Sequence, residues 1–178
     1  MARDGTLWIG TLKGVASLRD GRLTQYHEVA GQVANRLLEE HQGIIWFTLS
    51  DPGRLCAIQS GKAGCEGTEV LGNFAYSVFE DRKGAVWVSS ATGVWRWRPG
   101  TPHKFSYSGG VHSVISFIEL DGGALLLGTN DGMKHLADGR IQNYELPDVT
   151  GPMSVQHTLR SQDGGLSSVF RAKNRPWK

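Results

Sequence analysis

The 178-residue sequence lacks the features of several functional classes. No apolar stretch approaches the roughly 18–20 residues that a membrane-spanning helix needs. The N-terminal residues MARDGTLWIG have no apolar core of the kind found in signal peptides, so we expect none in this stretch. The formal net charge is +2, and no basic run is long enough to indicate a nucleic-acid-binding surface. A chain of this length is sufficient for one domain with a substantial core.

Proline is also scarce, whereas glycine and tryptophan are abundant. The chain has six prolines, 24 glycines and six tryptophans, and the glycine content is nearly twice the usual fraction of about 7%. This composition favours many short strands joined by tight turns. No segment has convincing helical periodicity. The stretch ANRLLEEH (34–41) contains helix-favouring residues, but we interpret it as a strand because its equivalents in the chain are β-prone.

A repeat of about 40 residues is the main feature that is present. GTLW at 5–8 recurs as GIIW at 43–46 and GAVW at 84–87, with weaker copies GALL at 123–126 and GGLS at 164–167. The leading glycines are 38, 41, 39 and 41 residues apart. Residues 7–26 also match residues 125–144 at nine positions, including the Asp-Gly turns at 20–21 and 138–139. This period is typical of a four-stranded propeller blade.

Each unit predicts four antiparallel strands, named A to D, with the tryptophan on strand B. Asp-Gly pairs indicate two-residue hairpin turns of type I′ between strands C and D. Residues 1–166 are then blades, comprising strands BCD, three ABCD units and a final A strand at 155–160. Residues 167–178 are predicted to be a disordered tail outside the repeat.

The predicted fold is an all-β propeller of four-stranded antiparallel blades, with about four blades in this chain. A blade cannot bury its apolar faces alone, so it must stack on neighbours. Two arrangements satisfy this need. The final A strand could pair with the first B strand and close a four-bladed ring. We favour the other arrangement, an arc of a larger propeller completed by further sequence or by self-association.

The segments RDGTLWIGTLKG (3–14) and EDRKGAVWVSSATGVWRW (80–97) resemble the repeat of the two-component regulator propeller family. The resemblance covers about residues 2–166, with departures at Leu126 and Ser167, which replace the tryptophan. It implies a periplasmic or otherwise extracytoplasmic sensor that binds a small molecule or a glycan fragment, or mediates dimerisation. The signalling domains that the family carries are absent from this chain.

Two alternative functions remain open. GIIWFT (43–48) resembles the repeat of streptogramin lyases, which are metal-dependent propeller enzymes, and a purely protein-binding scaffold is the third interpretation. None of the six histidines lies in a His-x-His or His-x₃-His pair, and no nucleophile, base and orienting residue occur in a recognisable pattern. We therefore predict no catalytic residues, no metal and no cofactor.

Several residues have a structural interpretation. Trp8, Trp46 and Trp87 share one repeat position and are expected to pack between blades. Trp95 and Trp97 are expected to pack on one face, with ligand stacking as the alternative. Asp4, Asp20, Asp81 and Asp138 are turn formers. Cys56 and Cys65 are expected to be free thiols, and a hairpin disulfide is the alternative in an oxidising compartment.

The candidate ligand-binding residues are the first residues of each A strand, which line the mouth of a propeller channel. They are polar and differ between repeats while the buried positions agree, as a binding surface on a repeated scaffold would. Arg36, Tyr76 and His157 have the chemistry to hold a sugar or a carboxylate. The alternative is a solvated loop edge. The complete set is Asn35, Arg36, Tyr76, Ser77, His112, Ser113, Gln156 and His157.

Overall fold

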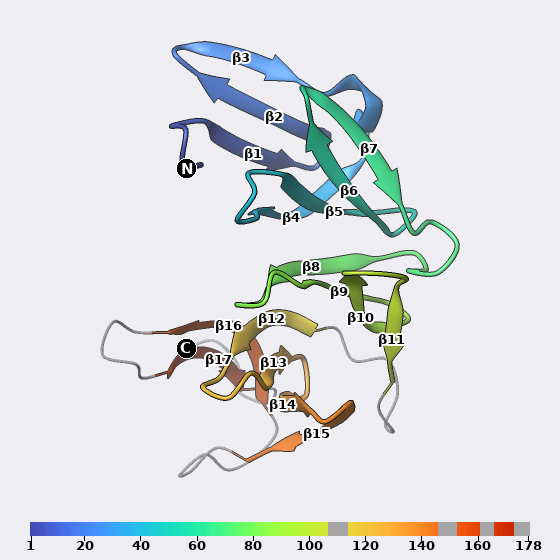
Figure 1. Cartoon of the computed structure of the whole chain (residues 1–178), viewed down its shortest axis with the longest axis vertical. Helices are drawn as coiled ribbons and strands as arrows, with labels where there is room; N and C mark the ends of the chain where they lie inside the picture. The colour runs from blue at the N-terminus through green and yellow to red at the C-terminus, as the bar shows by residue number, and fades with distance from the viewer. Residues whose placement is uncertain (107–113, 146–152, 161–165, 173–178) are drawn as a thin grey trace.

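The computed structural model describes residues 1–106, 114–145, 153–160 and 166–172 (Figure 1). These residues form strands joined by turns, and their one helical segment is the short 3₁₀ helix η1 (His27–Val29). No helix in the described ranges is long and apolar enough to cross a membrane. The predicted all-β class is therefore confirmed, and the segment 34–41 contains a strand, as predicted.

The strands group into five antiparallel sheets, which we call blades 1 to 5. Blade 1 contains β1 (Leu7–Thr11), β2 (Gly14–Arg19) and β3 (Arg22–Gln25). Blade 2 contains β4 (Val33–Glu39), β5 (Ile45–Ser50), β6 (Arg54–Gln59) and β7 (Lys62–Glu66). Blade 3 contains β8 (Ala75–Glu80), β9 (Val86–Ser90), β10 (Gly93–Arg98) and β11 (His103–Phe105). Blade 4 contains β12 (Val114–Glu119), β13 (Leu125–Thr129), β14 (Gly132–Ala137) and β15 (Arg140–Tyr144).

Blade 5 consists of β16 (Met153–Arg160) and β17 (Leu166–Ala172). The predicted disordered tail is therefore wrong for residues 167–172, because they continue the repeat as a B strand paired with β16. Residues 173–178 lie outside the described ranges. Since β16 pairs with β17, and β1 pairs with β2 alone in the described residues, the blades form an arc and not a ring closed between β16 and β1.

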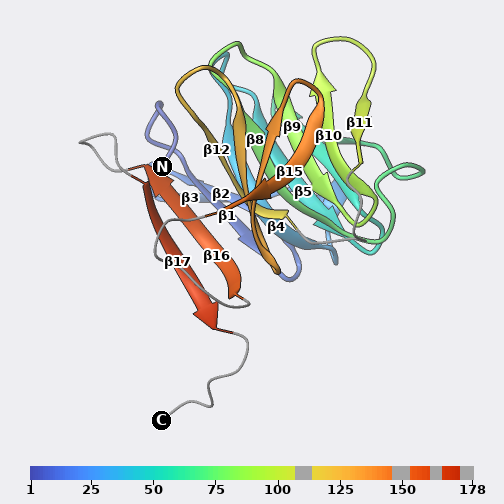
Figure 2. The same cartoon turned by 90° about the horizontal axis from the view of Figure 1, so that it is seen from below.

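The blades follow one another along this arc (Figure 1). Strands β4, β8 and β12 lie on its inner side, and β3, β7, β11 and β15 lie on its outer side. Figure 2 shows the hairpin of β16 and β17 beside the other blades. The inner strand of each blade contacts that of the next, which places β4, β8, β12 and β16 side by side.

The hairpin turns follow the predicted chemistry. Asp20 and Asp138 have φ values of 48° and 49°, and the glycine after each has a φ of 75°. Positive φ at both central residues defines the type I′ turn, which matches the twist of the flanking strands. The same geometry occurs at Ser60 and Gly61, with φ values of 52° and 76°, in a hairpin without an Asp-Gly pair.

The hydrophobic core is divided into four layers, one between each pair of neighbouring blades. Trp46 packs in the layer between blades 2 and 3, and Trp87 packs between blades 3 and 4, where both are buried. Trp8 is half-buried between blades 1 and 2. The predicted packing role of these three side chains is confirmed. Each blade is thus stabilised by burial against its neighbours.

Polar contacts also join each blade to the inner strand of the next. The Oγ of Ser89 donates to the carbonyl of Val114 at 2.7 Å. The hydroxyls of Ser116 and Thr158 lie 3.2 Å apart between blades 4 and 5. Because these groups are buried or nearly so, they have to be satisfied within the protein. The apolar layers and these polar contacts together fix the relative placement of the blades.

Cys56 on β6 and Cys65 on β7 form a disulfide. The expectation of two free thiols is therefore wrong. The two residues are direct partners in the β6–β7 register, and both side chains lie on the face that packs toward blade 1. The turn at 60–61 sets this register and so brings the two sulfur atoms together.

Candidate functional site

A β-bulge interrupts each of the four inner strands at the same repeat position. The register shifts leave one extra residue between Ala34 and Arg36, and likewise in β8, β12 and β16. The residues at the four bulges are Asn35, Tyr76, Ile115 and Gln156. A bulge bends its strand and redirects a side chain, and bulges are common beside functional sites. Three of the sequence-predicted candidates therefore share this special position.

The assignment in blade 4 is wrong by three residues. The sequence interpretation placed its candidates at His112 and Ser113, whereas the register makes Ile115 and Ser116 the equivalents of Asn35 and Arg36. His112 and Ser113 lie outside the described residues. Counting eight residues back from the leading glycine of each repeat, such as Gly123, would have found the correct positions.

Asn35 connects two blades. Its Nδ2 donates to the Oγ of Ser50 at 2.7 Å and to the carbonyl of Ala75 at 2.7 Å. Both amide protons are therefore engaged within the protein, and the side-chain oxygen is the group left for a ligand. This geometry gives Asn35 a positioning role at the start of blades 2 and 3.

Arg36 occupies a position at which the residue type varies between blades. Its equivalents are Ser77, Ser116 and His157. Ser77 and Ser116 are buried small residues, with exposed fractions of 3% and 6%, whereas Arg36 is a half-buried residue that carries a guanidinium at the same repeat position. His157 is exposed on blade 5. Because β8 and β12 lie between β4 and β16, the fold does not bring Arg36 and His157 together.

The guanidinium of Arg36 forms no hydrogen bond or ion pair with any residue that the structure describes. Its direct partner in the β4–β5 register is Thr48, which is fully buried and whose Oγ1 also lacks a hydrogen-bond partner in the described residues. A buried hydroxyl without a partner is costly, and the guanidinium has no protein group among the described residues that competes with a ligand. An anionic or hydroxyl-bearing ligand at this position would satisfy the guanidinium.

Tyr76 forms a parallel stack with Phe74, with ring centroids 6.0 Å apart and an interplanar angle of 9°. Phe74 has 41% of its surface exposed. Its backbone is fixed by a bridge to Ser50 and by the N–H of Ala91, which donates to the Phe74 carbonyl at 2.8 Å. The sequence interpretation missed Phe74, although an aromatic residue immediately before an inner strand was the available signal.

The other candidate aromatic residues have structural roles. Trp97 is buried, and its Nε1 donates to Glu66 at 3.0 Å. Trp95 is half-buried and donates to the Oγ1 of Thr92 at 3.2 Å. The two rings lie 6.4 Å apart, so the packing interpretation describes both. No group of three or more potential metal-ligating side chains occurs in the described parts of the chain.

Comparison with solved structures identifies the architecture. The chain matches the extracellular domain of a hybrid two component system from B. thetaiotaomicron with a TM-score of 0.78 and 18% identity, over 94% of this chain and 25% of that one. It matches virginiamycin B lyase from Staphylococcus aureus with a TM-score of 0.79 and 17% identity, over 95% and 61%. The fold is a β-propeller.

A gluconolactonase from Xanthomonas campestris is also similar, with a TM-score of 0.66, 14% identity and coverage of 95% of this chain and 67% of that one. The chain spans a quarter of the first structure and about three fifths of the second. No protein-family model matches the sequence, and no curated protein sequence does. At these identities the likeness establishes the fold, which sensors and enzymes share.

Proposed function

We propose that this chain is part of a ligand-sensing β-propeller, a binding module without catalytic activity of its own. The observation that carries the proposal is the guanidinium of the half-buried residue Arg36, which has no partner in the described residues, while its register partner Thr48 has a buried, unpaired hydroxyl. The exposed stack of Phe74 and Tyr76 begins the neighbouring inner strand. Together they provide an anion-binding group and an aromatic surface.

The ligand class that fits these groups is a small polar molecule or glycan fragment bearing a carboxylate. A guanidinium binds a carboxylate through two parallel hydrogen bonds, and an exposed aromatic ring offers a flat apolar surface to a sugar or another ring. Asn35 would fix the start of β4 and so the direction of Arg36, through its contacts with Ser50 and Ala75. The partners beyond the ligand would be output domains or a second copy of the propeller.

The proposal includes an extracytoplasmic location. The disulfide between Cys56 and Cys65 is of a kind that persists in oxidising compartments. The structures with a similar fold include the extracellular domain of a hybrid two component system. Both observations support the location, and the sensing role agrees with the resemblance of the repeats to two-component regulator propellers.

The test is a thermal-shift screen of uronic-acid oligosaccharides, neutral oligosaccharides and small carboxylates, followed by calorimetric titration of any stabilising compound. Arg36→Met should weaken binding of that compound at least about tenfold, because it removes a charge-assisted hydrogen-bond donor. Arg22→Met is the matched control, since Arg22 is an exposed arginine at the start of β3. The compound should be recovered unchanged.

Three results would contradict the proposal. Consumption of the compound would favour the lyase-like alternative, and an unchanged affinity in both arginine variants would remove Arg36 from the site. Absence of binding across the whole panel would favour the scaffold alternative.

A further inference from the structure

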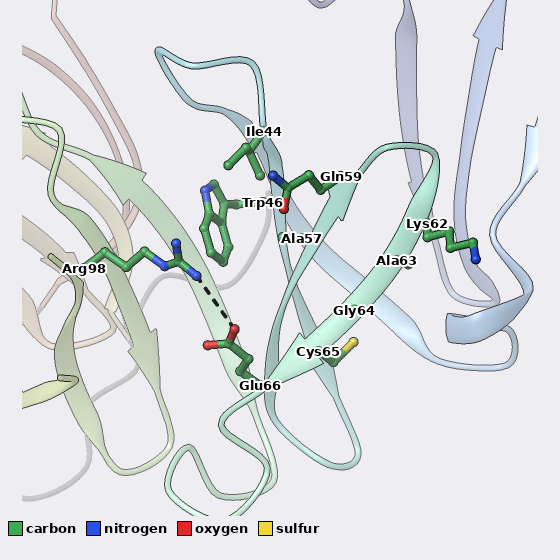
Figure 3. A pocket seen from close by; sticks show the side chains of 10 residues that line it. All are labelled: Ile44, Trp46, Ala57, Gln59, Lys62, Ala63, Gly64, Cys65, Glu66 and Arg98. Atoms are coloured by element: carbon green, nitrogen blue, oxygen red, sulfur yellow. Dashed lines mark ion pairs between the residues drawn. The ribbon is translucent and has the colours of Figure 1, made fainter. Parts of the chain in front are cut away.

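A second binding site is suggested by a groove between blades 2 and 3, which lies away from Arg36. Two adjoining cavities of about 370 and 490 Å³ share Ile44, Glu66 and Arg98. The second cavity extends to Glu40 and His41, which follow the end of β4 that is opposite its bulge. Each volume is within the range of small-molecule sites. Figure 3 shows the residues that line the first cavity.

The groove exists because blade 2 has small residues where the other blades have larger ones. Trp46, Ala57 and Gly64 are successive register partners on strands β5, β6 and β7. The residues equivalent to Ala57 and Gly64 are Ser17 and Thr24 in blade 1, Arg96 and His103 in blade 3, and His135 and Gln142 in blade 4. A Cβ added at Gly64 would meet no atom within 4 Å, so this wall of the groove is open.

Arg98 of blade 3 crosses the groove to Trp46 of blade 2. Its guanidinium carbon lies 5.0 Å from the centroid of the indole, and Figure 3 shows the guanidinium beside that ring. An arginine stacked on an aromatic ring is held in a fixed orientation, with its N–H groups free at the edge. The Arg98 side chain is about half exposed. The stack therefore presents an ordered cation to solvent.

Glu66 faces this cation without forming a hydrogen bond to it. The Nη2 of Arg98 and the Oε1 of Glu66 are 3.8 Å apart, which is beyond hydrogen-bond distance. The other carboxylate oxygen of Glu66 accepts from Trp97 Nε1 at 3.0 Å. Arg98 forms no hydrogen bond to any other side chain in the described residues. The edge of the Arg98 guanidinium, which can donate two parallel hydrogen bonds, is thus available to the carboxylate of a ligand. Glu66 competes with that ligand only weakly, because it does not hydrogen-bond to Arg98.

We propose that this groove binds a cyclic carboxylate, that is, a six-membered ring bearing one carboxylate group. The carboxylate would pair with the edge of the Arg98 guanidinium. The ring would occupy the space that Ala57 and Gly64 leave open, beside the indole of Trp46 and within reach of the amide of Gln59. A sugar acid and an aromatic acid share this chemistry, and the experiment separates the two sources.

The test is isothermal titration of the folded chain with D-glucuronate and with benzoate, each compared with its neutral methyl ester. At least one acid should bind, and its ester should bind at least about tenfold more weakly. Arg98→Met should weaken binding of the acid by a similar factor. Gly64→Gln, which introduces the residue that blade 4 has at this position, should also weaken it by filling the groove, whereas Arg22→Met, at an exposed arginine on β3, should leave it unchanged.

Glu66→Gln is the decisive variant, because misfolding cannot produce its expected effect. It removes the competing charge and keeps an oxygen to accept from Trp97, so affinity for the acid should rise about threefold or more as the cation loses its neighbouring carboxylate. The proposal is overturned if neither acid binds, if an ester binds as tightly as its acid, or if Arg98→Met and Glu66→Gln leave the affinity unchanged. Because Arg36 and Arg98 are tested separately, this outcome is distinct from a failure of the sensing proposal.

Discussion

The carboxylate of Glu119 accepts a hydrogen bond from the backbone N–H of Arg82 at 2.7 Å and so joins blade 4 to blade 3. The same contact recurs between Glu80 and the N–H of His41 at 2.8 Å, and between Glu39 and the N–H of Arg3 at 2.9 Å. In each case the last residue of an inner strand is a glutamate, and its carboxylate accepts a hydrogen bond from a backbone N–H in a turn of the preceding blade. The repeat therefore specifies the contact between blades as well as the strands within them.

Replacement of Glu119 should show what this contact contributes to stability. Glu119 is buried, so Glu119→Ala leaves the Arg82 N–H without a partner. We expect a loss of about 1–3 kcal/mol in the free energy of unfolding, measured by urea denaturation. Glu119→Gln keeps a hydrogen-bond acceptor, so its free energy of unfolding should fall by less than that of the alanine variant. Equal losses in the two variants would mean that the hydrogen bond is not the cause.

Two strand glycines in different surroundings, Gly128 on β13 and Gly64 on β7, should respond in opposite directions to alanine. A Cβ at Gly128 would lie 2.3 Å from the Oγ of Ser116 and 2.8 Å from Val155, so Gly128→Ala should destabilise the fold by about 1–3 kcal/mol through overpacking. Gly64→Ala meets open space and should be neutral or stabilising by a few tenths of a kcal/mol. Thermal unfolding of both variants measures the difference, and a destabilised Gly64→Ala would contradict the open wall of the groove.

Reduction of the disulfide should destabilise the protein. The link closes a short hairpin in a layer where Cys56 is fully buried, and the loop-entropy account gives a loss of about 2–3 kcal/mol. We expect dithiothreitol to lower the melting temperature of the native chain. The double variant Cys56→Ala, Cys65→Ala should melt at a lower temperature with or without the reductant. If dithiothreitol left the melting temperature of the native chain unchanged, the result would contradict the disulfide.

The first turn makes a pH-dependent contribution to stability. The N–H of Thr6 donates to Asp4 at 2.9 Å and lowers the pKa of that carboxyl below its usual 3.8, and Arg19 assists from 2.8 Å. Because the folded-state pKa is lowered, this stabilisation is present above the unfolded pKa and is lost as the pH falls through the folded value. An NMR titration of the Asp4 carboxyl should give a midpoint below 3.8. A midpoint at or above that value would contradict the contact.

The repeat could be predicted from sequence because its signals are local. A positive φ at Asp20 and Gly21 and a buried tryptophan at a fixed position leave recognisable residue types in each copy. The same reliance on residue types caused the error at β17. Ser167 replaces the tryptophan and basic residues follow, so the pattern ended while the pairing with β16 continued. In this strand, pairing overrides the local sequence signal.

The two proposed sites required the structure for different reasons. Arg36 was identified from sequence, but its lack of a partner and its neighbour Thr48 depend on the register of β4 with β5. The groove was not predicted, because Trp46 and Arg98 are 52 positions apart and come from different blades. Their contact depends on the packing of blade 2 on blade 3, which no single repeat encodes.

The central claim is that each blade is stabilised by strand pairing and by burial against its neighbours in the arc. Amide hydrogen exchange tests this claim most directly. Strands β1 and β5 occupy the same repeat position, but within the described residues β5 has two partner strands and is fully buried, whereas β1 has one and is largely exposed. We predict that amides of β5, β9 and β13 exchange slowest and that those of β1 exchange much faster. Protection of β1 equal to that of β5 would contradict this arrangement of the blades.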